Sequence, residues 1–197
     1  EYLGENVYLN MINGAKRYVY ITTPYLIVDS EMKTALCLAA KRGVDVQIIT
    51  PGIPDKKIVW DLTRSYYPEL LSAGVHIYEY TPGFIHSKLC ICDDEAAVTG
   101  TINFDYRSLY LHFENACLFI YNAVVLQAKM TFCVRRKNPR RSSLKIWGIS
   151  KSIEVCSAVS ITQSCGYLHR FCKKKSLGTL KQKMSIFICE AIFSSTD

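Results

Sequence analysis

The sequence predicts an α/β fold in which helices flank a mixed β-sheet, and three observations predict it. Segments in which β-branched and aromatic residues alternate, as in strands, lie between segments of helical spacing. The two helical segments stop at glycines, Gly43 and Gly74. The resulting series of strand, helix, strand, helix, strand is typical of parallel or mixed sheets.

The predicted elements follow from these patterns in chain order. The expected strands are residues 17–23, 44–50, 75–80, 88–92, 96–99 and 116–121. The expected helices are residues 31–42, which Asp29 or Ser30 would cap, and the amphipathic residues 58–73. Cys90 and Cys92 alternate along one predicted strand, where a free cysteine behaves as a small hydrophobic residue.

The regular pattern ends near Gln127, and the charge changes sign there. Residues 1–127 contain ten Lys and Arg against fourteen Asp and Glu, a net charge of −4, and residues 128–197 contain fourteen against three, a net charge of +11. We therefore expect one domain at residues 1–127 and a basic, poorly ordered tail at residues 128–197. Five cysteines between Cys133 and Cys189 are unusual for such a tail.

A frameshift is a second interpretation of the tail. Residues 130–141 (MTFCVRRKNPRR) can be written in codons that, read one base earlier, encode NDFLREAEKSKE. That second string is rich in strong helix formers. We therefore hypothesise that the chain leaves its native reading frame near Ala128.

Composition excludes several classes of protein. A chain of 197 residues that is 49% hydrophobic is long enough to form a folded domain with a core. No segment has the ~20 apolar residues of a membrane-spanning helix. The nine cysteines show neither the CxxC pairs nor the Cys/His clusters of a metal site, and we expect reduced thiols inside the cell.

The residues that point to chemistry lie between Phe84 and Asn103. A histidine at 86, a lysine at 88, an aspartate at 93 and the group Gly100-Thr101-x-Asn103 follow in close succession. Alternate residues of a strand share a face, so His86 and Lys88 should reach the same phosphate. The imidazole can attack phosphorus or carry a proton, and the ammonium can neutralise phosphate oxygens.

The other residues of this stretch receive supporting roles. We expect Thr101 and Asn103 to donate hydrogen bonds to the phosphate, and Gly100 to allow a turn and a close backbone approach. Asp93 is grouped with the catalytic motif, but its place at a strand end favours a structural tie. Glu114 could hold the far ring nitrogen of His86 and fix its tautomer. The remaining histidines, His76, His112 and His169, are interpreted as ordinary packed or surface residues.

The pattern HxKxxxxDxxxxxxGTxN resembles the HKD motif of the phospholipase D superfamily. The segments TPYL, ITPGIPDKK, RSYYPELLSAGVHIYEYTPGFIHSK and GTINFDYRSLYLHFENACLF are similar to the C-terminal half of bacterial cardiolipin synthases. The resemblance covers about residues 1–127. It implies a single phospholipase D-like half-domain that acts at the bacterial cytoplasmic membrane on anionic phospholipid.

The implied reaction transfers a phosphatidyl group between two phosphatidylglycerol molecules and releases glycerol. It passes through a phosphohistidine and needs no cofactor and no metal. The resemblance carries the site over to His86, Lys88, Asp93, Thr101, Asn103 and Glu114.

Departures from the family pattern leave alternatives open. Members of this type carry two such motifs and N-terminal membrane helices, whereas this sequence contains one His-x-Lys pair. The second half-site would come from the same full-length protein or from a homodimer partner, with His86 as nucleophile or as general acid. A homodimeric endonuclease-like phosphodiesterase is the alternative, but the charge of −4 argues against nucleic acid as a partner. The third reading is an inactive fragment, or a module that only binds membranes through its tail.

Overall fold

A computed structural model of the chain describes residues 2–137, 144–146 and 185–190. The strands are β1 Tyr18–Thr22, β2 Leu26–Ile27, β3 Asp45–Pro51, β4 His76–Tyr80, β5 Leu89–Cys92, β6 Ala96–Gly100, β7 Phe104–Asp105, β8 Asn115–Ile120, β9 Leu144–Ile146 and β10 Ser185–Glu190. The helices are α1 Leu3–Gly14, α2 Ser30–Lys41, α3 Lys57–Ser65, α4 Tyr67–Ser72, α5 Tyr106–Tyr110 and α6 Ala123–Lys137. The predicted α/β class is confirmed.

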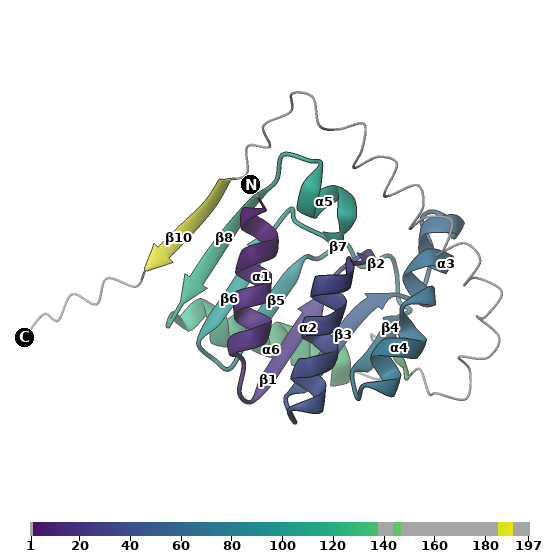
Figure 1. The fold of residues 1–197 in the computed structure, drawn as a ribbon, viewed down its shortest axis with the longest axis horizontal. Helices are drawn as coiled ribbons and strands as arrows, with labels where there is room; N and C mark the ends of the chain where they lie inside the picture. Colours follow the sequence, from purple (N-terminus) through teal and green to yellow (C-terminus); the bar gives the residue numbers. More distant parts are fainter. Residues whose placement is uncertain (1, 138–143, 147–184, 191–197) are drawn as a thin grey trace, which may run out of the picture.

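The main sheet is mixed and has the strand order β10-β8-β6-β5-β1-β3-β4-β9 (Figure 1). Strands β1, β3 and β4 run parallel, as the strand–helix–strand series predicts. Strand β6 pairs antiparallel with β5, to which a short turn joins it, and with β8, which follows after β7 and α5. The short strands β2 and β7 pair in a separate two-stranded sheet. Every predicted strand therefore forms, with bounds that shift by at most one residue.

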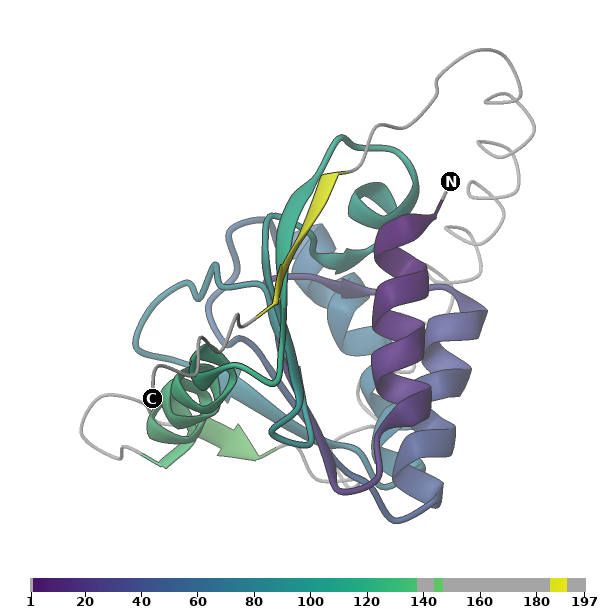
Figure 2. The same ribbon diagram turned by 90° about the vertical axis from the view of Figure 1, so that its left-hand side faces the viewer.

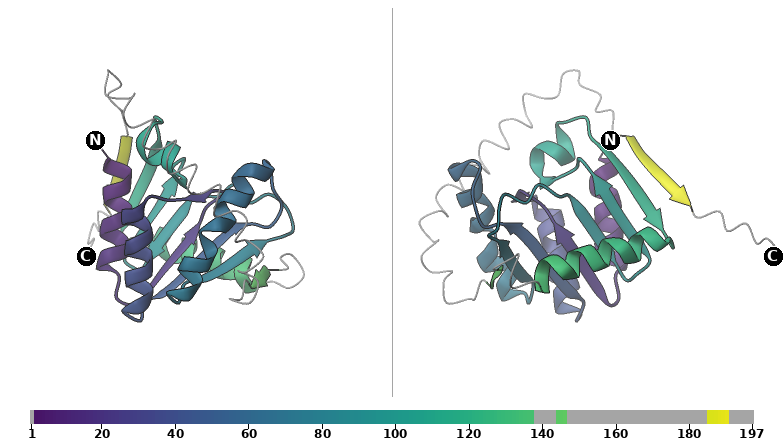
Figure 3. Two further views of the ribbon diagram at one scale, coloured as in Figure 1. Left: turned by 45° about the vertical axis from the view of Figure 1, so that its right-hand side comes forward. Right: turned by 180° about the vertical axis from the view of Figure 1, so that it is seen from behind.

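Helices cover both faces of the sheet. Figure 2 shows α1 and α2 on one face and α6 on the other, and Figure 3 shows α6 lying across the back of the strands. Alternate residues of β1 divide between the two faces: Val19 and Ile21 pack with α1 and α2, and Tyr20 stacks on Phe132 of α6, with ring centroids 4.8 Å apart. Burial on both faces explains why β5 reads as an unbroken apolar run.

Three details differ from the sequence expectation. The predicted helix 58–73 is divided into α3 and α4 at Tyr66, because Pro68 has no N–H to continue the hydrogen-bond ladder. Helix α1 was not predicted. Helix α6 continues to Lys137, ten residues beyond the expected end of the regular pattern, and its Phe132 is fully buried. Most of the predicted tail lies outside the described residues, and the division at residue 127 stays a prediction.

Helix α2 begins as the sequence predicted. The Asp29 side chain accepts a hydrogen bond from the backbone N–H of Met32 at 2.8 Å, which satisfies one of the free donors of the first turn. Among the described residues, no helix combines the length and the apolar character that a membrane crossing requires.

Candidate functional site

Apart from Asp93, the candidate site residues lie at or just outside one edge of the sheet, the edge at which the parallel strands β1 and β3 end. In the register of the sheet, Thr22 lies opposite Leu89, Leu89 opposite Thr99, and Gly100 opposite Ala116. The segments just outside these positions therefore start from a common edge, which is the upper edge in Figure 1. They hold His86 and Lys88 before β5, Thr101 and Asn103 after β6, and Glu114 before β8.

Lys88 is the buried centre of this edge, and only 9% of the residue is exposed. Its Nζ donates a hydrogen bond to the carbonyl oxygen of His86 at 2.8 Å, which leaves two N–H groups of the ammonium for other acceptors. Burial lowers the pKa of Lys88, and the nearby carboxylates of Glu114 and Asp105 oppose that shift. The lysine, Asp105 and Glu114 are thus one electrostatic group.

His86 lies in an extended segment before β5, because the strand starts only at Leu89. The prediction of a strand through His86 and Lys88 is therefore wrong for these two residues. The pairing of β5 with β1 ends at Leu89, which lies opposite Thr22. The imidazole is exposed, and its ring centroid lies 5.8 Å from that of Phe84. Among the described residues, no hydrogen bond or ion pair holds the His86 ring, so it remains available to a ligand.

Glu114 contacts Thr101 instead of His86. The Thr101 hydroxyl donates a hydrogen bond to Glu114 Oε2, and the Glu114 side chain is 8% exposed. His112 Nδ1 lies 3.7 Å from the other carboxylate oxygen of Glu114, and Arg107 lies 3.0 Å from His112 Nε2. Since an arginine can only donate, Nε2 is the acceptor nitrogen and Nδ1–H faces the carboxylate. His112, interpreted from the sequence as an ordinary surface residue, belongs to this network.

Asn103 is held by a hydroxyl from helix α5. Its Nδ2 lies 3.0 Å from Ser108 Oγ, while its Oδ1 is buried without a hydrogen-bond partner. Because the Ser108 hydroxyl can donate as well as accept, a half-turn of the amide keeps this bond and places Nδ2 where the unpartnered Oδ1 now lies. Asp105 caps α5 by accepting from Ser108 N at 2.7 Å. The D-x-x-S spacing of a helix cap could have identified Asp105 and Ser108 from the sequence.

Gly100 provides a close approach between β6 and β8. A Cβ atom at this position would lie 2.2 Å from the Asn115 carbonyl oxygen and 2.5 Å from Ala116 Cα. No side chain fits in that space, which confirms the predicted close backbone approach. The contact fixes Thr101, whose backbone N–H donates to the same Asn115 oxygen at 2.8 Å.

Asp93 lies at the other end of β5. Its carboxylate accepts hydrogen bonds from the backbone N–H groups of Lys16 at 2.6 Å, Arg17 at 2.9 Å and Tyr18 at 2.8 Å. Burial opposes its ionisation, but these three donors outweigh that effect and lower the pKa of Asp93. Five residues of extended chain separate it from Lys88, which is roughly 16 Å. The aspartate therefore ties the start of β1 to the end of β5, and the structure does not bring it to the other motif residues.

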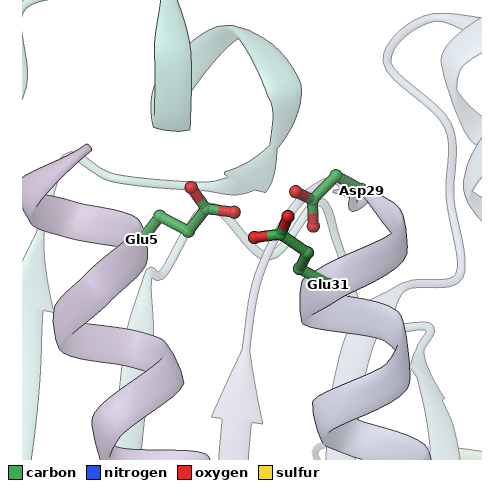
Figure 4. A group of neighbouring side chains, drawn as sticks. All are labelled: Glu5, Asp29 and Glu31. Carbon is green, nitrogen blue, oxygen red and sulfur yellow. The ribbon is translucent and has the colours of Figure 1, made fainter. Parts of the chain in front are cut away.

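Three carboxylates gather between α1 and α2 at the edge that carries the motif (Figure 4). Ligand atoms of Glu5, Asp29 and Glu31 lie within 4.8 Å of one another, the one such acidic, His or Cys group in the described part of the chain. The hydroxyl of Tyr110 contacts Glu5 and also Asp29, the latter at 2.5 Å. One hydroxyl hydrogen can serve only one carboxylate, so the second contact requires a protonated carboxyl group. Burial and the neighbouring Asp29 raise the pKa of Glu5 to about 7.

The sequence and the fold agree on the family. Residues 8–133 match the family model described as "Cardiolipin synthase, PLD-like domain". The chain belongs to that phospholipase D-like family. A cardiolipin synthase of Halalkalibacterium halodurans is 50% identical over 118 residues, which are 59% of this chain and 24% of the relative. An uncharacterized protein of Streptococcus mutans is 57% identical over 141 residues, which are 72% of this chain and 31% of the relative.

A solved structure shares the fold. The phospholipase D family member Nuc of Salmonella typhimurium superposes with a TM-score of 0.58 at 22% identity, over 73% of this chain and 90% of that chain. The curated relatives are longer, since this chain spans about a quarter to a third of their length. The phospholipase D-like resemblance and the fold predicted from the sequence are thereby confirmed.

Proposed function

We propose that this chain supplies one half-site of a phosphatidyltransferase that joins two phosphatidylglycerol molecules into cardiolipin and releases glycerol. The observation that carries the proposal is an exposed His86 ring two residues from the buried Lys88, whose ammonium interacts with Glu114, the hydrogen-bond partner of Thr101. The likeness to named cardiolipin synthases supports the choice of lipid. The net charge of −4 over residues 1–127 argues against a nucleic-acid backbone, which binds to basic surfaces.

The proposed chemistry has two displacements at phosphorus. A histidine nitrogen attacks the phosphate, the bond between phosphorus and nitrogen forms, and the bond to the glycerol headgroup breaks as its oxygen takes a proton from a second histidine. A hydroxyl of another phosphatidylglycerol then gives its proton to that second histidine and displaces the first. His86 fits either role. The two free N–H groups of Lys88 would bind the non-bridging oxygens during both steps.

The sequence supplies one His-x-Lys pair, so the second histidine must come from another copy or from a further part of a longer protein. Thr101 adopts a different role here from the predicted phosphate donor, because its hydroxyl hydrogen is engaged by Glu114. Asn103 remains a phosphate donor once its amide turns. The other carboxylate oxygen of Glu114, Oε1, lies 3.7 Å from His112 Nδ1.

The test is conversion of phosphatidylglycerol in anionic vesicles by the purified chain, with the mass of the protein determined in parallel. Cardiolipin formed by a dimer and lost in His86→Ala would support a site completed by two copies. The matched control is His76→Ala, because His76 is exposed at the opposite end of β4 from the site edge. Hydrolysis of nucleic acid without lipid turnover would favour the phosphodiesterase alternative. A monomer without turnover that gains activity when a chain carrying a second motif is added would identify a severed half.

A further inference from the structure

We infer that the site edge docks on an anionic lipid bilayer through an apolar rim formed by Ile53, Ile58, Phe84, Leu111 and Phe113. These side chains are between 37% and 75% exposed. All five belong to segments that leave the main sheet at the edge of the site. This inference rests on the proposed lipid function and adds the surface through which the site reaches its substrate.

One side of the rim is linked to His86 by a chain of contacts. Residues 53–58 follow the end of β3, and Asp55 in this segment accepts a hydrogen bond from the Tyr25 hydroxyl at 2.5 Å. The Tyr25 ring lies 6.4 Å from the ring of Phe84, and Phe84 lies 5.8 Å from the ring of His86. The segment that holds Ile53 and Ile58 is therefore connected to His86 through Asp55, Tyr25 and Phe84.

The other side of the rim is linked to Glu114. Leu111 and Phe113 are the sequence neighbours of His112, whose Nδ1 lies 3.7 Å from the Glu114 carboxylate. Both apolar side chains point to solvent, with exposures of 50% and 66%, while Glu114 between them and β8 is buried. The rim thus borders the site on two sides. Large exposed apolar side chains grouped around a polar site mark an interaction surface.

The charge on the rim segments selects an anionic membrane as the occupant. The exposed Lys56, Lys57 and Arg107 lie among the apolar residues, and Asp55 is the one exposed carboxylate of these segments. The sum is three positive charges and one negative charge, a net +2, while residues 1–127 as a whole carry −4. A negatively charged bilayer therefore attracts these rim segments, while the carboxylates of Glu5, Asp29 and Glu31 lie between α1 and α2, outside the rim. Basic residues beside exposed aromatic and aliphatic side chains are typical of surfaces that enter the lipid interface.

The test must separate docking by the rim from attraction of the membrane to the +11 segment after residue 127. Tryptophan placed at the rim, Phe113→Trp, reports insertion through quenching by phosphatidylglycerol that is brominated in its acyl chains. Met130→Trp on the outer face of α6 is the matched control, since Met130 is 60% exposed and Phe113 is 66% exposed. Both variants share the same tail and the same native tryptophans.

We expect strong quenching of Phe113→Trp on phosphatidylglycerol vesicles and none beyond background for Met130→Trp. Adding Lys56→Gln and Lys57→Gln should weaken the apparent vesicle affinity of Phe113→Trp on the order of 10-fold. Equal quenching at both positions, or quenching at neither, would overturn the inference. A change in Phe113→Trp emission that depends on protein concentration without vesicles would assign the rim to a second copy and overturn it as well.

Quenching of Phe113→Trp measured in a His86→Ala background separates membrane docking from catalytic turnover. Quenching there, with no cardiolipin formed by the unsubstituted chain either alone or together with a chain that carries a second motif, would uphold the surface and reject the phosphatidyltransferase. Turnover of dispersed short-chain phosphatidylglycerol without quenching on vesicles would uphold the enzyme and reject the rim.

Discussion

The Thr101 hydroxyl lies between Glu114 and the backbone of Asn115, and both of its hydrogen-bonding roles are occupied. It donates its hydrogen to Glu114 Oε2 and accepts from Asn115 N at 2.9 Å. The Glu114 side chain is 8% exposed, so its oxygens need hydrogen-bond donors from the protein. The arrangement gives Thr101 the role of positioning Glu114, where the sequence alone predicted a direct donor to phosphate.

Replacement of Thr101 separates these two roles. Thr101→Val keeps the shape but leaves the buried Glu114 oxygen without its donor, which should lower the free energy of unfolding by about 1.5–3 kcal/mol. Thr101→Ser should retain stability. A double-mutant cycle with Glu114→Gln, followed by denaturant unfolding, should give a coupling energy of about 1 kcal/mol or more. A raised KM for phosphatidylglycerol without any change in stability would instead support a direct phosphate contact.

Asp93 is predicted to control stability and not turnover. Asp93→Asn replaces a carboxylate that accepts from Lys16, Arg17 and Tyr18 with an amide that has one oxygen, at an expected cost of about 2–4 kcal/mol. Its φ of 55° is tolerated by asparagine, so the backbone is not a confounding factor. Denaturant unfolding measures the loss, and Glu95→Gln, an exposed neighbour, is the control.

Low pH should remove the stabilisation that the Asp93 carboxylate provides. Because the folded state lowers the pKa of Asp93 from its ordinary 3.8, its contribution is present above that pH and is lost as the pH falls through the folded value. Below pH 4 the free energy of unfolding should therefore fall more steeply with decreasing pH for the unsubstituted chain than for Asp93→Asn. Full loss of turnover in Asp93→Asn with unchanged stability would contradict the structural role.

The sequence predicted those features that follow from local periodicity and from strand ends. The strands formed because their side chains alternate between two buried faces. Asp93, at the end of a strand, accepts hydrogen bonds from the backbone at the start of β1. The division of the helix at Tyr66 could also have been read from Pro68. In contrast, the pairing of Thr101 with Glu114, thirteen residues apart, depends on how the segment after α5 returns to β8. No spacing rule encodes that return, and none places Tyr110 between carboxylates of α1 and α2.

Glu5 should make the protein less stable at high pH. Its folded pKa of about 7 lies above the ordinary 4.5, so its contribution is complete below pH 4.5 and is lost as the pH rises through 7. We expect the free energy of unfolding to fall on the order of 2 kcal/mol between pH 5 and pH 8, as Glu5 becomes charged in a buried position beside Asp29 and Glu31.

Glu5→Gln mimics the protonated state and should flatten this dependence, as measured by denaturant unfolding at a series of pH values. Glu69→Gln, at a carboxylate that is 58% exposed, should leave the slope unchanged. An identical slope in Glu5→Gln and the unsubstituted chain would show that another group is responsible.

Helix α6 provides a test of the predicted frameshift. Leu126, Met130 and Val134 form an exposed apolar stripe at i, i+4 and i+8 along the helix. The adjacent frame places asparagine at position 130 and arginine at position 134, where the side chains face solvent, and keeps phenylalanine at the buried position 132. It also places leucine at the half-buried position 133. The burial pattern of α6 therefore fits the adjacent frame better than the present sequence.

A triple variant, Met130→Asn with Cys133→Leu and Val134→Arg, should raise stability by about 1 kcal/mol, because it moves apolar surface from solvent to the helix–sheet contact. The control keeps the exposed positions apolar and makes the half-buried position polar, with Met130→Leu, Cys133→Ser and Val134→Ile. Thermal unfolding compares the two. A less stable triple variant, or coding DNA whose adjacent frame stops shortly after codon 128, would reject the frameshift and leave the present α6 as the native helix.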